Sequence, residues 1–190
     1  MDKTHPKGKK NLAELDEMVK QGLNRLYDFQ HSDGGWGWWK QGDSDHFMTA
    51  YVVWGLTLAR EAGVDIKADV LDRGANFLDK EIVEEETNPD MQAWMLHALS
   101  SQHANLKRQT ISKFQSAAFD NMWKNRDQLN AYTRALLALS AHSYGDADKA
   151  RILVQNLENG VKIDSKPDTS IVQRGNQSSH AGVMGTAHWG

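Results

Sequence analysis

The chain has 190 residues, of which 39% are apolar and 25% charged, a composition that suits one globular domain or a piece of a larger one. Its net charge of −3 at pH 7 gives no reason to expect nucleic acid or an anionic membrane as a partner. The sequence holds no cysteine, which excludes a disulfide, a thiolate nucleophile and an internal thioester within this chain.

Residues 1–10 are polar and contain Pro6 and Gly8, so they are predicted to form a disordered tail. From residue 11 onward, apolar residues recur at spacings of three and four, which predicts an amphipathic helix. The stripe consists of Leu12, Leu15, Val19, Gly22, Leu26 and Phe29. The helix is expected to end near His31, because two consecutive glycines follow shortly after it.

The next segment, Gln30-His-Ser-Asp-Gly-Gly-Trp-Gly-Trp-Trp39, combines three glycines with three tryptophans. The glycines permit positive φ and a close approach of the backbone, and each indole needs a dry surface and one hydrogen-bond acceptor. Trp36 alone could satisfy the packing of the turn. Trp38 and Trp39 are therefore candidates for contact with a partner, with packing between helices as the alternative.

Six further helices follow in chain order. The second is expected after Asp43-Ser44-Asp45, whose side chains are good N-caps, and the fourth is expected at Pro89, which suits a first helical turn. The third covers about residues 68–84, the fifth 106–123, the sixth about 131–144 and the seventh 146–160. The second helix carries apolar residues in several directions and is expected to be buried on more than one side; its main stripe is Phe47, Tyr51, Trp54 and Leu58.

The pattern as a whole predicts an all-α domain of helical hairpins over residues 11–160. Residues 161–164 alternate like a short strand, and the Gly- and Ser-rich remainder of 161–190 is expected to be loop within the same domain. Three of the helices share small alanines beside large aromatic or apolar residues. The stretches that share this pattern start with Thr49-Ala-Tyr-Val-Val-Trp, Met91-Gln-Ala-Trp-Met-Leu and Ala131-Tyr-Thr-Arg-Ala-Leu. This similarity indicates a repeated core and not a repeated active site.

The chain resembles the thioester-containing domain of bacterial alpha-2-macroglobulins. The stretches that carry the resemblance are residues 26–39, Met48-Thr-Ala-Tyr-Val-Val53, residues 123–139 and Thr186-Ala-His-Trp-Gly190. The resemblance implies an α/α toroid, here a partial ring of about seven helices with an irregular C-terminal tail. It also implies a periplasmic, cell-envelope or extracellular endopeptidase inhibitor, in which a Cys-x-Glu-Gln thioester captures proteases.

The sequence departs from this family because it has no Cys-x-Glu-Gln motif. In the family that motif precedes the helix that corresponds to the first one predicted here. Family members also continue with further helices after the stretch that corresponds to Thr186–Gly190. Two interpretations therefore stay open. Either the chain is an excised part of the toroid, or its parent belongs to a branch without a thioester. A partial ring would expose an apolar helix face, which predicts self-association of the chain. The other partners expected are the rest of the macroglobulin chain and, through the full-length parent, proteases.

The sequence predicts no catalytic residue. His97 and His103 are six positions apart, which does not fit paired metal ligands on one helix face, and Asp43 to Asp45 are better explained as caps than as a diphosphate site. His188 and Trp189 are candidates for packing on the ring or for a partner contact. We therefore expect a non-catalytic scaffold without cofactor or metal. The alternatives are a terpenoid-cyclase-like enzyme on the same toroid and an open helical-repeat interaction module.

Overall fold

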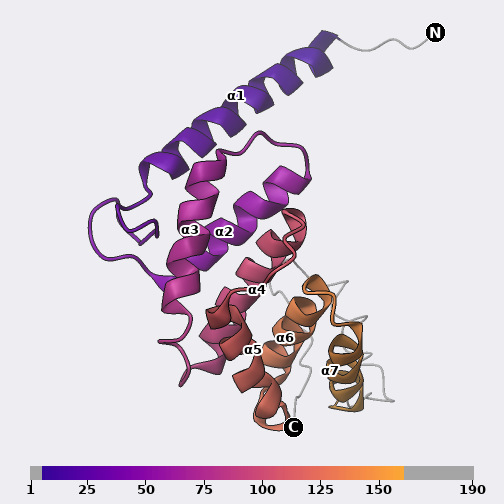
Figure 1. The fold of residues 1–190 in the computed structure, drawn as a ribbon. Coiled ribbons are helices and arrows are strands. Elements are labelled where there is room, and N and C mark those ends of the chain that lie inside the picture. Colours follow the sequence, from indigo (N-terminus) through magenta and orange to yellow (C-terminus); the bar gives the residue numbers. More distant parts are fainter. Residues whose placement is uncertain (1–5, 161–190) are drawn as a thin grey trace, which may run out of the picture.

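The computed structural model describes residues 6–160, which form helices joined by short loops (Figure 1). The helices are α1 (Pro6–Asp28), α2 (His46–Glu61), α3 (Ala68–Glu81), α4 (Pro89–Asn105), α5 (Lys113–Lys124), a 3₁₀ turn η1 (Arg126–Gln128), α6 (Ala131–Ser143) and α7 (Ala147–Gly160). Residues 6–160 contain no strand, so the all-α prediction is confirmed. None of these helices is long and apolar enough to cross a bilayer. The strand and loop predicted for 161–190 lie outside the described residues.

Side-chain caps begin α2, α4 and α6. The backbone N–H of the third helical residue donates to Asp45 in α2, at 2.8 Å, to Asn88 in α4, at 3.4 Å, and to Asn130 in α6, at 2.9 Å. Such a bond satisfies a backbone donor that has no partner within the helix. The predicted cap at Asp45 is confirmed, as is the placement of Pro89 in a first turn.

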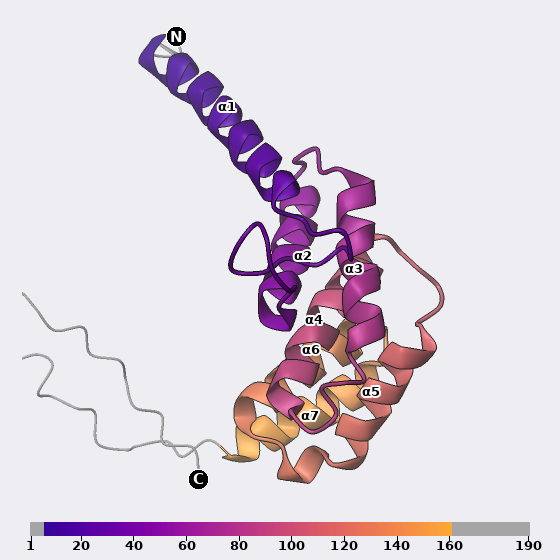
Figure 2. The same cartoon turned by 90° about the vertical axis from the view of Figure 1, so that its left-hand side faces the viewer.

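Helices α2, α4 and α6 lie side by side in one row. Helix α2 packs against α4, and α4 packs against α6. Helix α3 packs against α2, α5 contacts both α3 and α4, and α7 packs against α6 (Figures 1 and 2). Consecutive helices thus pair as hairpins, and the hairpins stack along the chain.

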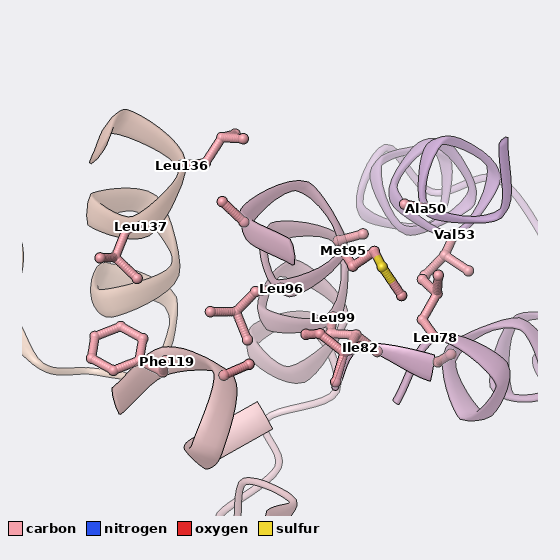
Figure 3. Packing of buried hydrophobic residues seen from close by; sticks show 14 of the residues in the cluster. Ala50, Val53, Leu78, Ile82, Met95, Leu96, Leu99, Phe119, Leu136 and Leu137 are labelled. Carbon is pink, nitrogen blue, oxygen red and sulfur yellow. The ribbon is translucent and has the colours of Figure 1, made fainter. Parts of the chain in front are cut away.

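The core lies between the row of α2, α4 and α6 and the helices that pack against it, and α4 is at its centre. Figure 3 shows Met95 on the side of α4 that faces Val53, and Leu96 on the side that faces Leu137 and Phe119. Met95 and Leu96 are completely buried. Apolar residues of α3 and the residue directly after it are also buried, and they are Leu71, Ala75, Phe77, Leu78 and Ile82.

Helix α1 differs from its prediction in its start and in its burial. It begins at Pro6, so the predicted boundary at residue 11 lies too late; proline suits the first helical turn and lysine is a good helix former. The helix projects away from the others (Figures 1 and 2). Its stripe is exposed at Leu15 and Val19, and only its last turns and the residue that follows, including Leu26 and Phe29, pack against the core.

Three other predictions are corrected. The fifth helix begins at Lys113 and not near residue 106, because α4 continues to Asn105 and Lys107 then takes a positive φ of 50° that ends helical structure. The third helix ends at Glu81, before the predicted 84. Three residues of the apolar stripe predicted for the second helix lie exposed, because no described element covers their side of the helix. These are Phe47, Tyr51 and Leu58.

Candidate interaction surface

Trp36 anchors the loop between α1 and α2. Its side chain is only 2% exposed, and its indole N–H donates to the carbonyl oxygen of Leu26 at 2.9 Å. Its backbone N–H donates to Thr49 Oγ1 at 2.9 Å, which ties the loop to α2. The predicted need of this indole for a dry surface and one acceptor is therefore confirmed.

Two glycines make this packing possible. Gly34 has a φ of 97°, a conformation that other residues rarely adopt, and a Cβ there would lie 2.6 Å from the carbonyl oxygen of Arg73. Gly74 on α3 lies against the Trp36 ring, where a Cβ would be 2.6 Å from Cζ3. The importance of Gly74 could not be predicted, because nothing in the sequence places α3 beside Trp36.

Trp38 and Trp39 lie outside the core. Their side chains are 69% and 78% exposed, so they are not used for packing between the described helices. His31 holds the backbone of this loop through both of its ring nitrogens. Its Nε2 lies 3.0 Å from the carbonyl oxygen of Trp39, and its Nδ1 lies 3.0 Å from Ser44 Oγ. The two indoles are thus presented to solvent from a hydrogen-bonded loop, which keeps them as candidates for a partner contact. The other two candidates, His188 and Trp189, lie outside the described residues.

A larger surface, which we call the aromatic face, is formed by Phe47, Tyr51, Trp54, Trp94 and His97 on α2 and α4. Ring centroids of neighbours are 5.6 Å apart for Trp54 and Trp94, and 6.0 Å apart for Phe47 and Trp94. The Trp94 indole N–H donates to the carbonyl oxygen of Phe47 at 3.4 Å, across the two helices. Phe47 is 44% exposed and Tyr51 55%, so the cluster remains open to solvent among the described residues.

His97 closes the aromatic face at its buried edge. Its side chain is nearly buried between Trp54 and Trp94, and Nδ1 has no hydrogen-bond partner among the described residues. Burial lowers the pKa of His97, because the charged ring would lose its hydration. His97 is therefore neutral at neutral pH and packs against the two indole rings.

An open apolar pocket lies between α6 and α7. It has a volume of about 680 Å³ and is lined by residues that include Ala135, Leu139, Val154 and Leu157. Together with the aromatic face, it forms apolar surface on α2, α4, α6 and α7 that no part of residues 6–160 covers. Contiguous apolar surface that stays uncovered is typical of an interface.

A second pocket, of about 350 Å³, is polar and lies beside α3, α4 and α5. Asp79 accepts hydrogen bonds there from Ser112 Oγ at 2.5 Å and from Gln115 Nε2 at 2.7 Å. Gln115 in turn accepts from the Tyr144 hydroxyl at 2.9 Å. Burial, with a further contribution from the charge of Asp79, raises the pKa of Tyr144, so this hydroxyl stays protonated and donates. The network links α3, α5 and the end of α6, and it explains the pocket as a structural feature.

These features define a class of protein: an array of helical hairpins whose conspicuous surfaces are apolar and aromatic, as in a scaffold that packs against other structure. The family model for the A-macroglobulin TED domain matches residues 1–180 of the chain. The chain therefore belongs to the A-macroglobulin TED domain family, and its fold is part of an α/α toroid.

The similar proteins are alpha-2-macroglobulins. The chain is 50% identical to alpha-2-macroglobulin of Thermotoga maritima over 66 residues. These matched residues are 35% of this chain and 4% of that protein. Its fold is similar to native Escherichia coli alpha-2-macroglobulin from domain MG7 to the C-terminus, with a TM-score of 0.58, 23% identity, and coverage of 77% of this chain and 24% of that one. The trypsin-activated E. coli protein gives a TM-score of 0.52 at 22% identity, covering 73% and 10%.

The chain thus corresponds to a small part of much longer proteins. The recognition of a bacterial alpha-2-macroglobulin thioester-domain fragment from sequence is confirmed by these matches. The terpenoid-cyclase alternative is not favoured by them. The similar solved chains continue well beyond the matched region, so the rest of a macroglobulin chain is the natural neighbour of this array.

Proposed function

We propose that this chain is a non-catalytic scaffold part of an alpha-2-macroglobulin-like endopeptidase inhibitor. The observation that carries the proposal is the family match over residues 1–180 in a sequence without cysteine. A helical array of this family that holds no thiol cannot form the thioester itself. Its contribution is to build the wall of the toroid that positions a thioester held elsewhere in the parent, or to enclose a protease without one.

The uncovered surfaces support a role inside a larger molecule. The aromatic face and the pocket between α6 and α7 are apolar, and neither is covered by the described residues. In the parent protein these surfaces would pack against the remaining toroid helices and neighbouring domains of the macroglobulin chain. The proposed location is the periplasm or cell envelope, where such an inhibitor would meet foreign proteases.

The proposal is tested with the full-length parent protein and trypsin, the protease named for the activated E. coli relative. Trypsin should become associated with the parent after cleavage, as measured by size-exclusion chromatography. Labelled methylamine should either label a residue outside this chain, if the parent has a thioester, or give no label, if it has none. Peptide mapping that placed the label within residues 1–190, or a parent that did not retain trypsin, would contradict the proposal.

A further inference from the structure

A cluster of metal-ligating side chains lies where α2 begins and α3 ends. His46 is the first residue of α2, Glu81 is the last residue of α3, and Glu84 lies in the turn that follows. One ligand atom from each of the three residues lies within 4.8 Å of the other two. Ligands bound roughly 2.0–2.2 Å from a common ion stand about 3–4 Å apart, so small side-chain movements would bring these three atoms around one ion.

The His46 ring is already oriented by the protein. Its Nδ1 lies 2.6 Å from Glu85 Oε1, and the ring packs against Phe77 with centroids 6.0 Å apart. These two contacts fix the ring, and the His46 side chain is still 22% exposed. A histidine that ligates a metal through one nitrogen usually donates its other ring N–H to a carboxylate. Glu85 occupies that position at Nδ1, and within residues 6–160 no hydrogen bond is made to Nε2.

The charges at this end of α3 favour a bound cation. Glu81, Glu84, Glu85 and Glu86 fall within six consecutive residues, at the C-terminal end of the helix, where the backbone carbonyls carry partial negative charge. Among the described residues, the only ion pair these carboxylates make is the one between Glu85 and His46. The carboxylates therefore repel one another and the helix end, and a divalent cation would relieve that repulsion.

A buried amide side chain contacts the backbone of the same turn. Gln92 on α4 is only 2% exposed, and its Nε2 donates to the carbonyl oxygen of Ile82 at 3.0 Å. Its Oε1 is buried and has no hydrogen-bond partner among the described residues. A buried amide oxygen without a partner is uncommon, and it is independent of the acidic cluster.

We propose that His46, Glu81 and Glu84 bind one divalent transition-metal ion of the Zn²⁺ class, with Glu85 as the residue that orients the histidine. An imidazole combined with two carboxylates suits Zn²⁺ or Co²⁺ better than Ca²⁺, which takes oxygen ligands. The ion would join the start of α2 to the end of α3 and so clamp the first helical hairpin. The site is at the surface of the array, and its role is structural. It does not depend on the proposed inhibitor function.

Isothermal titration calorimetry of the full 190-residue chain with ZnCl₂, after treatment with a chelator, measures the site. We expect stoichiometric binding of one ion that is lost in His46→Gln and in Glu84→Gln, and binding about tenfold weaker in Glu85→Gln. Glu84 is exposed, so its substitution leaves the fold intact. Circular dichroism of each variant checks that the helices are preserved.

Two controls separate this site from other zinc ligands in the chain. Glu86→Gln removes a neighbouring carboxylate, and a variant carrying His180→Gln and His188→Gln removes histidines of the C-terminal segment; both should bind Zn²⁺ like the wild type. Co²⁺ gives a second readout, because ligation by His46 should produce visible absorption bands that are absent in His46→Gln. Zinc binding unchanged in His46→Gln would overturn the proposal. So would Ca²⁺ binding as tight as Zn²⁺ binding and indifferent to His46, since it would mean a purely acidic cation patch.

Discussion

The two sides of the α2–α4 pair carry similarly apolar residues but differ in what covers them. Val53 and Met95 face the core and are completely buried. Phe47 and Tyr51, on the same helix as Val53, are 44% and 55% exposed. The covered side gains its burial from α3 and from the packing of α4, whereas nothing among the described residues covers the aromatic face.

Hydrophobicity along a helix therefore shows which side of the helix is apolar but does not identify the element that covers that side. The covered side is expected to determine the stability of this chain, because burial of apolar surface is the main favourable term in folding. The aromatic face is expected to contribute little to stability and to determine association instead. Substitutions on the two sides should therefore affect different measurements.

The largest effect is expected from Leu96→Ala in the middle of α4. Leu96 is completely buried between α4 and its neighbours, so its truncation leaves a cavity and should lower the free energy of unfolding by about 2–5 kcal/mol. Leu139→Ala on α6 is the matched control, because Leu139 is 50% exposed; its effect should stay within about 0.5 kcal/mol. Urea denaturation followed by circular dichroism measures both. Equal losses in the two variants would mean that burial in the core does not determine the stability of this chain.

The next effect concerns the close approach of α3 to Trp36. Gly74→Ala places a Cβ 2.6 Å from the indole ring and 2.9 Å from Val53 Cγ2, and this overpacking should cost about 1–3 kcal/mol of unfolding free energy. Gly55→Ala is the control, since Gly55 lies in α2 with open space around its Cβ position. Removing a glycine from a helix interior should there raise stability by about 0.5–1 kcal/mol. The pair is informative because the sign differs; a loss of stability in both variants would argue against the contact with Trp36.

On the aromatic face, the double substitution Phe47→Ser and Tyr51→Ser should weaken self-association and leave the unfolding free energy almost unchanged. Aromatic residues dominate the energy of many interfaces, so we expect the dissociation constant of the oligomer to rise at least about tenfold, which corresponds to roughly 1.4 kcal/mol. Analytical ultracentrifugation over a range of concentrations makes the comparison. A wild-type chain that stays monomeric at high concentration would count against the prediction.

The sequence predicts the seven helices in their order and the starts of α2 and α4, but not the neighbours of each helix. Asp45 and Pro89 mark helix starts through local interactions with the backbone, and these do not depend on the surrounding tertiary structure. Trp36 was identified because an indole beside glycines must be packed. By contrast, the stripes of α1 and α2 have the period of buried helices, yet Leu15 and Tyr51 are exposed. Periodicity reports which side of a helix is apolar and cannot report whether another element covers it.

The cluster at His46 could not be predicted for a related reason. His46 and Glu85 are 39 positions apart and meet only because α2 and α3 form a hairpin. In the sequence, Glu84 to Glu86 have the appearance of a solvated helix end, and His46 that of a residue in a first helical turn. Neither segment alone carries the spacing of metal ligands, so the juxtaposition is a property of the fold.

The smallest of the expected effects is a pH dependence that originates at the boundary between the two sides. Burial lowers the pKa of His97 in the folded chain below its ordinary value of 6.5. Below pH 6.5 the unfolded chain therefore binds a proton that the folded chain resists, so the stability contributed by neutral His97 is present above pH 6.5 and is lost as the pH falls from there toward the folded-state pKa. Thermal unfolding at pH 7.5 and pH 5.0 measures the difference. His97→Gln removes the titrating ring, and its Tm should fall less between these two pH values than that of the wild type. If the two proteins lost the same amount, the stability of the array in acid would depend on other groups, and His97 would pack against Trp54 and Trp94 without a cost of protonation.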